Sequence, residues 1–268
     1  MTLLSVLARQ HSAFAREELL AAVLCGDVQV NGAVVRDPRL RLPSGAAVTL
    51  EPQQRHASRG AIKLQQALDA FCVDVSGLAV LDAGAATGGF TDCLLSNGAR
   101  LVFSVDVAYG MLSYSLRQDP RTVVLERTNA MHLAGTQLQP RPDLAVCDLS
   151  FRSLRGAATH LLDLTERQCL IALAKPQFEW LDPPPTFAGV VAIDADVAAI
   201  LQDLFADLER ERVAVRACVR SPILGRRGNR EAFLLLARLG AAEATPWGEQ
   251  AQPPTQFLAE LRARADAV

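Results

Sequence analysis

The feature that most constrains the fold is a glycine-rich turn between a short apolar run and a helical segment. The apolar run covers residues 78–81, the turn holds Gly84, Gly88 and Gly89, and residues 90–96 have the apolar spacing of a helix. Because glycine has no Cβ, a ligand can lie against such a turn, and the free N–H groups at the start of the helix attract polar oxygens. The stretch therefore predicts a ligand-binding turn in an α/β fold.

The spacing of these glycines does not match two common nucleotide-binding motifs. It is not the Gly-x-Gly-x-x-Gly of dinucleotide enzymes, and no Gly-Lys-Ser/Thr of a P-loop is present. Asp106 ends the next apolar run, at the position where such folds keep an acid for ribose hydroxyls. Together with Asp82 before it, the turn resembles the first motif of S-adenosylmethionine-dependent methyltransferases. From the turn alone, another kind of α/β enzyme remains the alternative.

Short apolar runs alternate with helical patterns from residue 78 onward, which predicts a doubly wound, mostly parallel, Rossmann-like α/β sheet. We expect strands at 78–81, 101–105, 122–125, 144–147, 169–173, 213–219 and 232–238, and helices at 90–96, 111–117, 154–163 and 195–209. In such sheets the ligand lies beyond the carboxyl ends of the strands. Polar or glycine residues follow five of the strands at that edge: Asp82 and Gly84, Asp106, Asn129, Asp148 and Lys175.

The N-terminal 51 residues predict a separate, small α+β domain. Two short helices, at 3–9 and 15–24, precede alternating valines, an Asn31-Gly32 hairpin turn and a strand at 47–50. With Arg16 and Asn31 among the matching residues, this arrangement resembles the αL RNA-binding motif. The Arg-Leu-Asp opening usual in that motif is Thr-Leu-Leu-Ser in this chain. The resemblance implies that this domain binds RNA.

Polar residues 52–59 are expected to form a linker, residues 60–240 the methyltransferase domain and residues 241–268 a C-terminal tail with a short helix near 257–264. A helix is also expected at 61–71, with Lys63 in its first turn. A cation there opposes the helix dipole, so its place is better explained by a ligand.

Composition narrows the class of protein. With 268 residues and 50% hydrophobic content the chain is globular, and its net charge of −2 neither favours nor excludes a nucleic-acid partner. The six cysteines are scattered in apolar runs without metal-ligand spacing, which indicates core residues in a reducing compartment. No apolar run is long enough to span a membrane, so we expect a cytoplasmic protein.

Lysine usage is unusual, because only Lys63 and Lys175 among the 27 basic residues are lysines. Where arginine serves as the general surface cation, a remaining lysine can mark a site that needs a compact ammonium able to lose its proton. Chance retention is the alternative for either lysine.

Four residues, Lys63, Asp148, Lys175 and Glu231, resemble the Lys-Asp-Lys-Glu tetrad of the FtsJ-like RNA ribose 2′-O-methyltransferases. The surrounding segments are similar to the TlyA family of these enzymes, in one colinear order from about residue 15 to 238: Ser58–Gly60, Thr87–Leu95, Val105–Val107, Leu116–Arg121, Glu126–Asn129, Asp148–Phe151, Lys175–Glu179 and Gly228–Glu231. The resemblance implies methyl transfer from S-adenosylmethionine to 2′-hydroxyls of ribosomal RNA or ribosomal subunits, without a metal.

The resemblance also assigns roles. Lys175 would lower the pKa of the ribose hydroxyl and could accept its proton, Asp148 and Glu231 would hold that lysine, and Lys63 would complete the network. The implied cofactor-binding residues are Asp82, Gly84, Ala85, Gly88, Gly89, Phe90, Asp106, Asn129 and Ala130. The candidate RNA-binding residues are Arg16, Asn31, Arg59, Arg226, Arg227 and Arg230.

One segment departs from the family. Residues 180–189 replace a Gly-Lys-Gly-Gly-like stretch, and we expect this loop to border the RNA entrance and alter the choice of target. Its Asp182-Pro183-Pro184 resembles a motif of amino-group methyltransferases, but that motif belongs after the fourth strand. Two competing functions stay open: an RNA-binding assembly factor without catalysis, and the membrane lysis implied by the name haemolysin given to relatives. The modified nucleotide, the subunit and the oligomeric state are left open as well.

Overall fold

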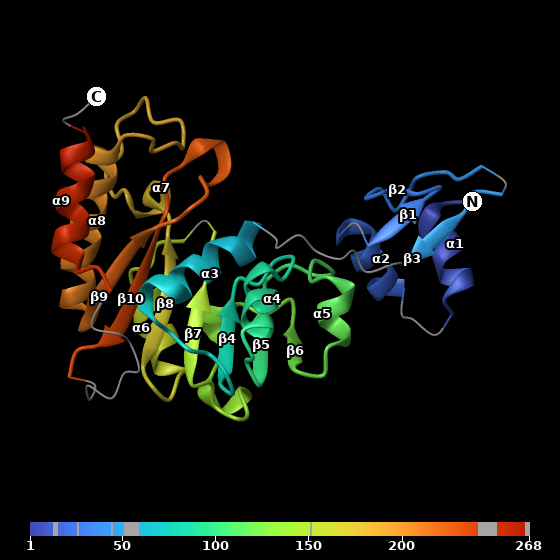
Figure 1. Ribbon diagram of the computed structural model, residues 1–268, viewed down its shortest axis with the longest axis horizontal. Helices are drawn as coiled ribbons and strands as arrows, with labels where there is room; N and C mark the ends of the chain where they lie inside the picture. Colours follow the sequence, from blue (N-terminus) through green and yellow to red (C-terminus); the bar gives the residue numbers. More distant parts are fainter. Residues whose placement is uncertain are drawn as a thin grey trace.

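The computed structural model describes residues 1–12, 16–25, 27–43, 45–50, 59–150, 152–240 and 251–265 (Figure 1). These residues form two sheets, a small three-stranded sheet near the N-terminus and a seven-stranded sheet in the rest of the chain, and helices pack against both. The expected linker at 52–59 lies outside the described residues except for Arg59.

The small sheet has the order β2-β1-β3 and is antiparallel throughout. The strands of this sheet are β1 (Val28–Val30), β2 (Ala33–Val34) and β3 (Val48–Leu50), and two helices precede them, α1 (Leu3–Gln10) and α2 (Arg16–Cys25). The β1–β2 turn is made by Asn31 and Gly32, both with positive φ, and Asn31 Oδ1 accepts a hydrogen bond of 2.9 Å from Ala47 N. The core of this part includes Leu3, Leu7 and Leu19, and Tyr114 from the large sheet's side packs against it.

The large sheet confirms the predicted mostly parallel α/β fold. Its order is β6-β5-β4-β7-β8-β10-β9, and β10 runs antiparallel to both of its neighbours. The strands are β4 (Ala79–Ala83), β5 (Leu101–Val105), β6 (Thr122–Leu125), β7 (Leu144–Cys147), β8 (Cys169–Ala174), β9 (Val213–Arg220) and β10 (Ala232–Arg238). The strand order reverses direction between β4 and β7, which is where a doubly wound sheet opens a crevice for a ligand.

Helices cover both faces of this sheet, because successive strand residues point to opposite sides. On one face, α3 (Arg59–Phe71), α4 (Gly89–Ser96) and α5 (Tyr114–Gln118) share a core with Val80; on the other, α6 (Ala157–Asp163), α8 (Asp194–Arg210) and α9 (Pro254–Ala265) share a core with Leu81. Short helical segments complete the fold: η1 (Ala130–His132), η2 (Gly135–Gln137), α7 (Pro176–Glu179) and η3 (Arg226–Gly228). None of the described helices is long and apolar enough to cross a bilayer.

Several elements differ from the sequence prediction. Helix α3 starts at Arg59, so Lys63 lies beyond its first turn, and α5 and α6 each start three residues later than expected. Helix α9, expected as a short helix near 257–264 in the C-terminal tail, starts at Pro254 and buries Phe257 and Leu261 in the main core. Cys72 is exposed at the end of α3, unlike the buried cysteines at 93, 147, 169 and 218. These differences arise from tertiary packing, which local sequence periodicity does not report.

Candidate functional site

The glycine turn after β4 is held close to the neighbouring strand ends. Gly84 has a φ of 91°, and a Cβ at this position would lie 2.7 Å from the backbone oxygen of Asp148. The Asp106 carboxylate accepts hydrogen bonds from Ala86 N at 2.8 Å and from Ala108 N at 2.7 Å. Glycine is therefore required at position 84 both for its backbone conformation and for the close approach of the loop after β7.

A pocket of about 580 Å³, here called the turn pocket, lies beside this turn. Apolar walls come from Val107, Met111 and Leu149, and polar groups from Asp106 and Asn129. Four of the predicted cofactor residues line it: Gly84, Asp106, Asn129 and Ala130. A partly apolar ligand with hydroxyl groups fits these walls, because the Asp106 carboxylate that lines the pocket can accept further hydrogen bonds.

The other five predicted cofactor residues, Asp82, Ala85, Gly88, Gly89 and Phe90, are not among those that line the turn pocket. A Cβ at Gly88 would overlap the side chain of Leu116, and the Phe90 ring packs 5.9 Å from that of Phe233. These residues shape the turn and pack helix α4 against its surroundings.

Asp82 is fully buried in β4. Its Oδ2 accepts a hydrogen bond of 2.7 Å from Thr91 Oγ1, while its Oδ1 is buried with no hydrogen-bond partner among the described residues. Burial, opposed by the Thr91 hydrogen bond, raises the pKa of Asp82 to about 7. The residue thus ties β4 to α4 across the glycine turn.

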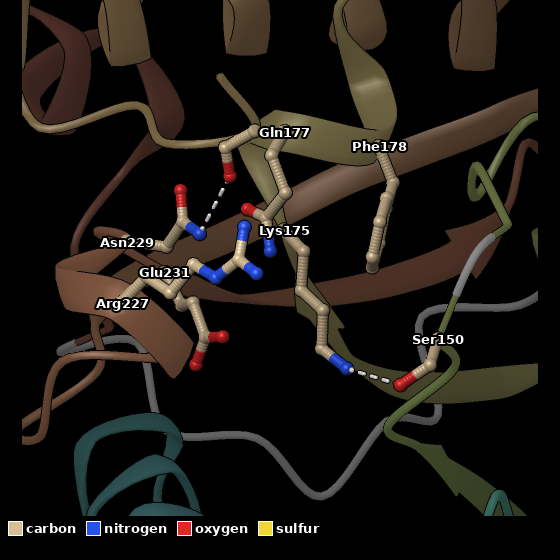
Figure 2. Close-up of a pocket in the computed structure, with 8 residues that line it drawn as sticks. Ser150, Lys175, Gln177, Phe178, Arg227, Asn229 and Glu231 are labelled. Atoms are coloured by element: carbon tan, nitrogen blue, oxygen red, sulfur yellow. Dashed lines mark hydrogen bonds between the residues drawn. The ribbon is translucent and has the colours of Figure 1, made fainter.

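A second pocket, of about 350 Å³ and here called the lysine pocket, adjoins the first (Figure 2). It is lined by Ser150, Lys175, Gln177, Phe178, Gly189, Arg227, Asn229 and Glu231. Ser150 lines both pockets, so the two cavities meet at this residue.

The four residues of the tetrad form two ion pairs. Lys175 Nζ lies 2.5 Å from Asp148 Oδ1 and donates a hydrogen bond of 3.2 Å to Ser150 Oγ. Lys63 Nζ donates to Glu231 Oε2 at 2.5 Å, and both of these side chains are at least nine-tenths buried. The sequence predicts that Glu231 holds Lys175, whereas in the structure its ion-pair partner is Lys63.

Two residues that the sequence reasoning did not single out support this arrangement. A Cβ at Gly225 would overlap the Glu231 carboxylate, so glycine leaves room for that group. Glu179 accepts from Ser153 Oγ at 2.5 Å and from Leu154 N at 2.9 Å, which ties α7 to the loop after β7. Burial, opposed by these hydrogen bonds, raises the pKa of Glu179. Glu179 lies in the segment Lys175–Glu179, which is similar to the family, and this similarity was the one sequence signal that could have pointed to it.

The candidate RNA-binding residues have different surroundings. Arg59 donates to Leu224 O at 2.7 Å, and Arg230 pairs with Asp194 at 2.8 Å, so both hold local structure. Arg227 lines the lysine pocket, and Arg16 is exposed at the start of α2. Asn31 serves the β1–β2 turn, and the side chain of Arg226 is outside the described part of the chain.

The sheet order, with β10 antiparallel between β8 and β9, and the paired pockets beyond the strand ends define a Rossmann-like α/β protein with a ligand crevice at this edge of the sheet. A family model described as FtsJ-like methyltransferase matches residues 56–238. The chain therefore belongs to the FtsJ-like methyltransferase family.

Similar proteins narrow the place within this family. The chain is 39% identical over 236 residues to the 16S/23S rRNA (cytidine-2′-O)-methyltransferase TlyA of Mycobacterium tuberculosis, covering 86% of this chain and 87% of the relative. It is 32% identical to Hemolysin A of Brachyspira hyodysenteriae over 78% of this chain and 88% of that protein. A solved structure described as a hemolysin from Streptococcus thermophilus superimposes with a TM-score of 0.69 at 30% identity, covering 98% and 94% of the two chains.

Proposed function

We propose that this chain transfers a methyl group from S-adenosylmethionine to the 2′-hydroxyl of a cytidine in ribosomal RNA. The observation that carries the proposal is the position of Lys175. Its ammonium is ion-paired with Asp148 and donates a hydrogen bond to Ser150, the residue at which the two pockets meet. The TlyA relative, named for the same reaction, supports the choice of substrate. Because ribosomal RNA is the substrate, the proposal also places the protein in the cytoplasm.

The turn pocket suits S-adenosylmethionine. Asp106 would accept hydrogen bonds from the ribose hydroxyls, Asn129 and Ala130 would border the adenine, and Val107, Met111 and Leu149 would supply apolar contacts. When bound, the cofactor supplies an electrophilic methyl group carried on a sulfonium. A side chain at position 84 would be pressed between the ligand and the Asp148 backbone, so the absence of a Cβ keeps this path open.

Lys175 would orient the nucleophile in the lysine pocket. An ammonium has three hydrogens, and with Asp148 as ion partner and Ser150 as acceptor it retains capacity for a substrate oxygen. Its positive charge stabilises the oxygen as that atom loses its proton. The proton leaves through the Lys175–Asp148 pair: Nζ accepts it while passing one of its own to the carboxylate 2.5 Å away.

The Lys63–Glu231 pair and the two parts of the chain are assigned roles in the same reaction. The Lys63–Glu231 pair keeps Glu231 at the wall of the lysine pocket. We assign residues 1–51 to RNA binding, with exposed Arg16 as a phosphate contact, and residues 60–240 to methyl transfer.

Methyl incorporation from labelled S-adenosylmethionine into ribosomal subunits lacking the modification tests the function. Lys175→Met keeps the length of the side chain and removes the charge, so we expect transfer to fall at least 100-fold, within the usual range for loss of a positioned acid or base. Arg264→Met, which removes an exposed charge on α9, is the matched control and should keep full activity. Cofactor binding by calorimetry should survive both changes.

Two outcomes would contradict the proposal. Full transfer by Lys175→Met would exclude the mechanism. RNA binding by the wild-type protein without methyl incorporation into either subunit would instead favour a non-catalytic assembly factor.

A further inference from the structure

We infer that the lysine pocket receives the nucleobase of the target nucleotide, and that Gln177 and Arg227 recognise a cytosine there. This inference rests on the proposed function and extends it from the sugar to the base.

The position and size of the pocket suit a nucleoside. A ribose whose 2′-oxygen contacts Lys175 and faces the turn pocket must place its base away from Ser150, where the two pockets meet. The lysine pocket has about 350 Å³ of room. Since a water molecule takes roughly 30 Å³ of liquid volume, a hydroxyl group alone would leave most of this space unfilled.

Gln177 supplies a polar oxygen to this pocket that has no hydrogen-bond partner in the described part of the chain. Its Oε1 is buried and accepts no hydrogen bond from any described residue. A buried acceptor in this state costs free energy unless a ligand satisfies it. The other amide in the pocket, Asn229, is engaged differently: its Oδ1 accepts from Val191 N at 2.8 Å and its Nδ2 donates to Gly189 O at 3.1 Å. Asn229 thus fixes the backbone at Gly189 and Val191, whereas the Gln177 oxygen can accept a hydrogen bond from a ligand.

The chemistry of the two side chains matches cytosine. The Gln177 amide presents an acceptor beside a donor, which fits the exocyclic amine and the ring nitrogen of cytosine. Arg227 carries only donors and would bind the O2 carbonyl. In Figure 2 both side chains extend to the same side of Lys175. Phe178 adds an apolar wall, with its ring centroid 6.0 Å from Lys175 Nζ.

Uracil and adenine each fail at one of these contacts. Uracil has a carbonyl where cytosine has its amine, so with the Gln177 amide in its observed orientation two acceptors would face each other at the buried Oε1. Adenine repeats the amine and ring nitrogen of cytosine but has a C–H in place of O2, so it gives Arg227 nothing to bind. The two residues together therefore favour cytosine over uracil and adenine.

The test uses ribosomal subunits in which the mapped target cytidine is kept or changed to uridine or adenosine. For the wild-type protein we expect kcat/KM to be at least tenfold higher on cytidine than on either replacement, the size of effect typical of a specific base contact. Gln177→Met should bring the cytidine-to-uridine ratio to within about twofold of one. Arg227→Met should do the same for the cytidine-to-adenosine ratio, and calorimetry should show unchanged cofactor binding in both variants.

The two variants report independently, so the Arg227 result decides if Gln177→Met does not fold. Wild-type base preferences in the folded variants, or an equal loss of rate on all three substrates, would overturn the inference while leaving the proposed function intact. A wild-type protein that methylates none of the subunits would overturn both.

Discussion

Removing one member of the Lys63–Glu231 ion pair is expected to destabilise the protein far more than removing both. The two side chains are 10% and 4% exposed and their charged atoms lie 2.5 Å apart. Lys63→Met leaves the Glu231 carboxylate buried without its cation, and breaking a buried pair in this way costs about 3–5 kcal/mol. In Lys63→Met/Glu231→Gln both charges are gone, so the cost should fall to about 1–2 kcal/mol, mostly for imperfect packing.

Urea unfolding of the two single variants and the double variant measures this coupling. Arg210→Met is the control, since this arginine forms an exposed ion pair within α8, and it should change the free energy of unfolding by less than about 1 kcal/mol. A double variant whose loss equals the sum of the two single losses would refute the reasoning, because it would mean that the two buried charges do not compensate one another.

The same variants separate the structural part of the pair from its part in catalysis. The double variant should fold and bind S-adenosylmethionine, yet transfer methyl groups at least tenfold more slowly, because Glu231 also lines the lysine pocket. Wild-type turnover in the folded double variant would remove both residues from the catalytic machinery and leave Lys175 and Asp148 alone in it.

Three further predictions concern the turn and the loop after β7. Because the pKa of Asp82 is raised from 3.8 to about 7, its protonated form favours folding, and stability should fall by up to about 4 kcal/mol as pH rises from about 4 to about 7. Asp82→Asn should remove this fall in urea midpoints recorded between pH 4 and 8, and parallel curves for the two proteins would show that the buried Asp82 carboxyl is not its cause. Gly84→Ala should weaken cofactor binding at least tenfold by calorimetry, since its Cβ would lie 2.7 Å from Asp148 O. The control Gly110→Ala has a positive φ but open space around its Cβ, so it should bind the cofactor normally. Equal losses of affinity in the two variants would mean that backbone strain, and not the contact with Asp148, is responsible. Glu179→Gln removes the charge that accepts from Ser153 and Leu154 and pairs with Arg155 at 3.1 Å. Because Arg155 keeps its ion pair with Asp207, the change should cost about 1–3 kcal/mol in thermal unfolding, and an unchanged midpoint would show that α7 does not depend on these contacts.

Much of the fold was predictable because its signals are local. A buried parallel strand is a short apolar run, and a glycine turn followed by a helix is recognisable from neighbouring residues, so the strands β4 to β10 were expected within a few residues of their observed bounds. The lysine-poor composition and the family-like segments also point to Lys63 and Lys175 without any knowledge of the fold. The assignment of the first 51 residues to RNA binding and the roles of the site residues remain predictions.

The sequence by itself determined which residues could meet at the edge of the sheet, because the order of strands and the residues that follow them are written along the chain. Only the tertiary structure decided which carboxylate pairs with which lysine, since Lys63 and Glu231 are 168 positions apart and no local pattern reports that contact. The same holds for the burial of Asp82, the docking of α9 and the Gln177 oxygen that no described residue contacts by a hydrogen bond. Burial and ion pairing depend on packing between distant segments, and it is packing that turned a set of candidate residues into two adjoining pockets.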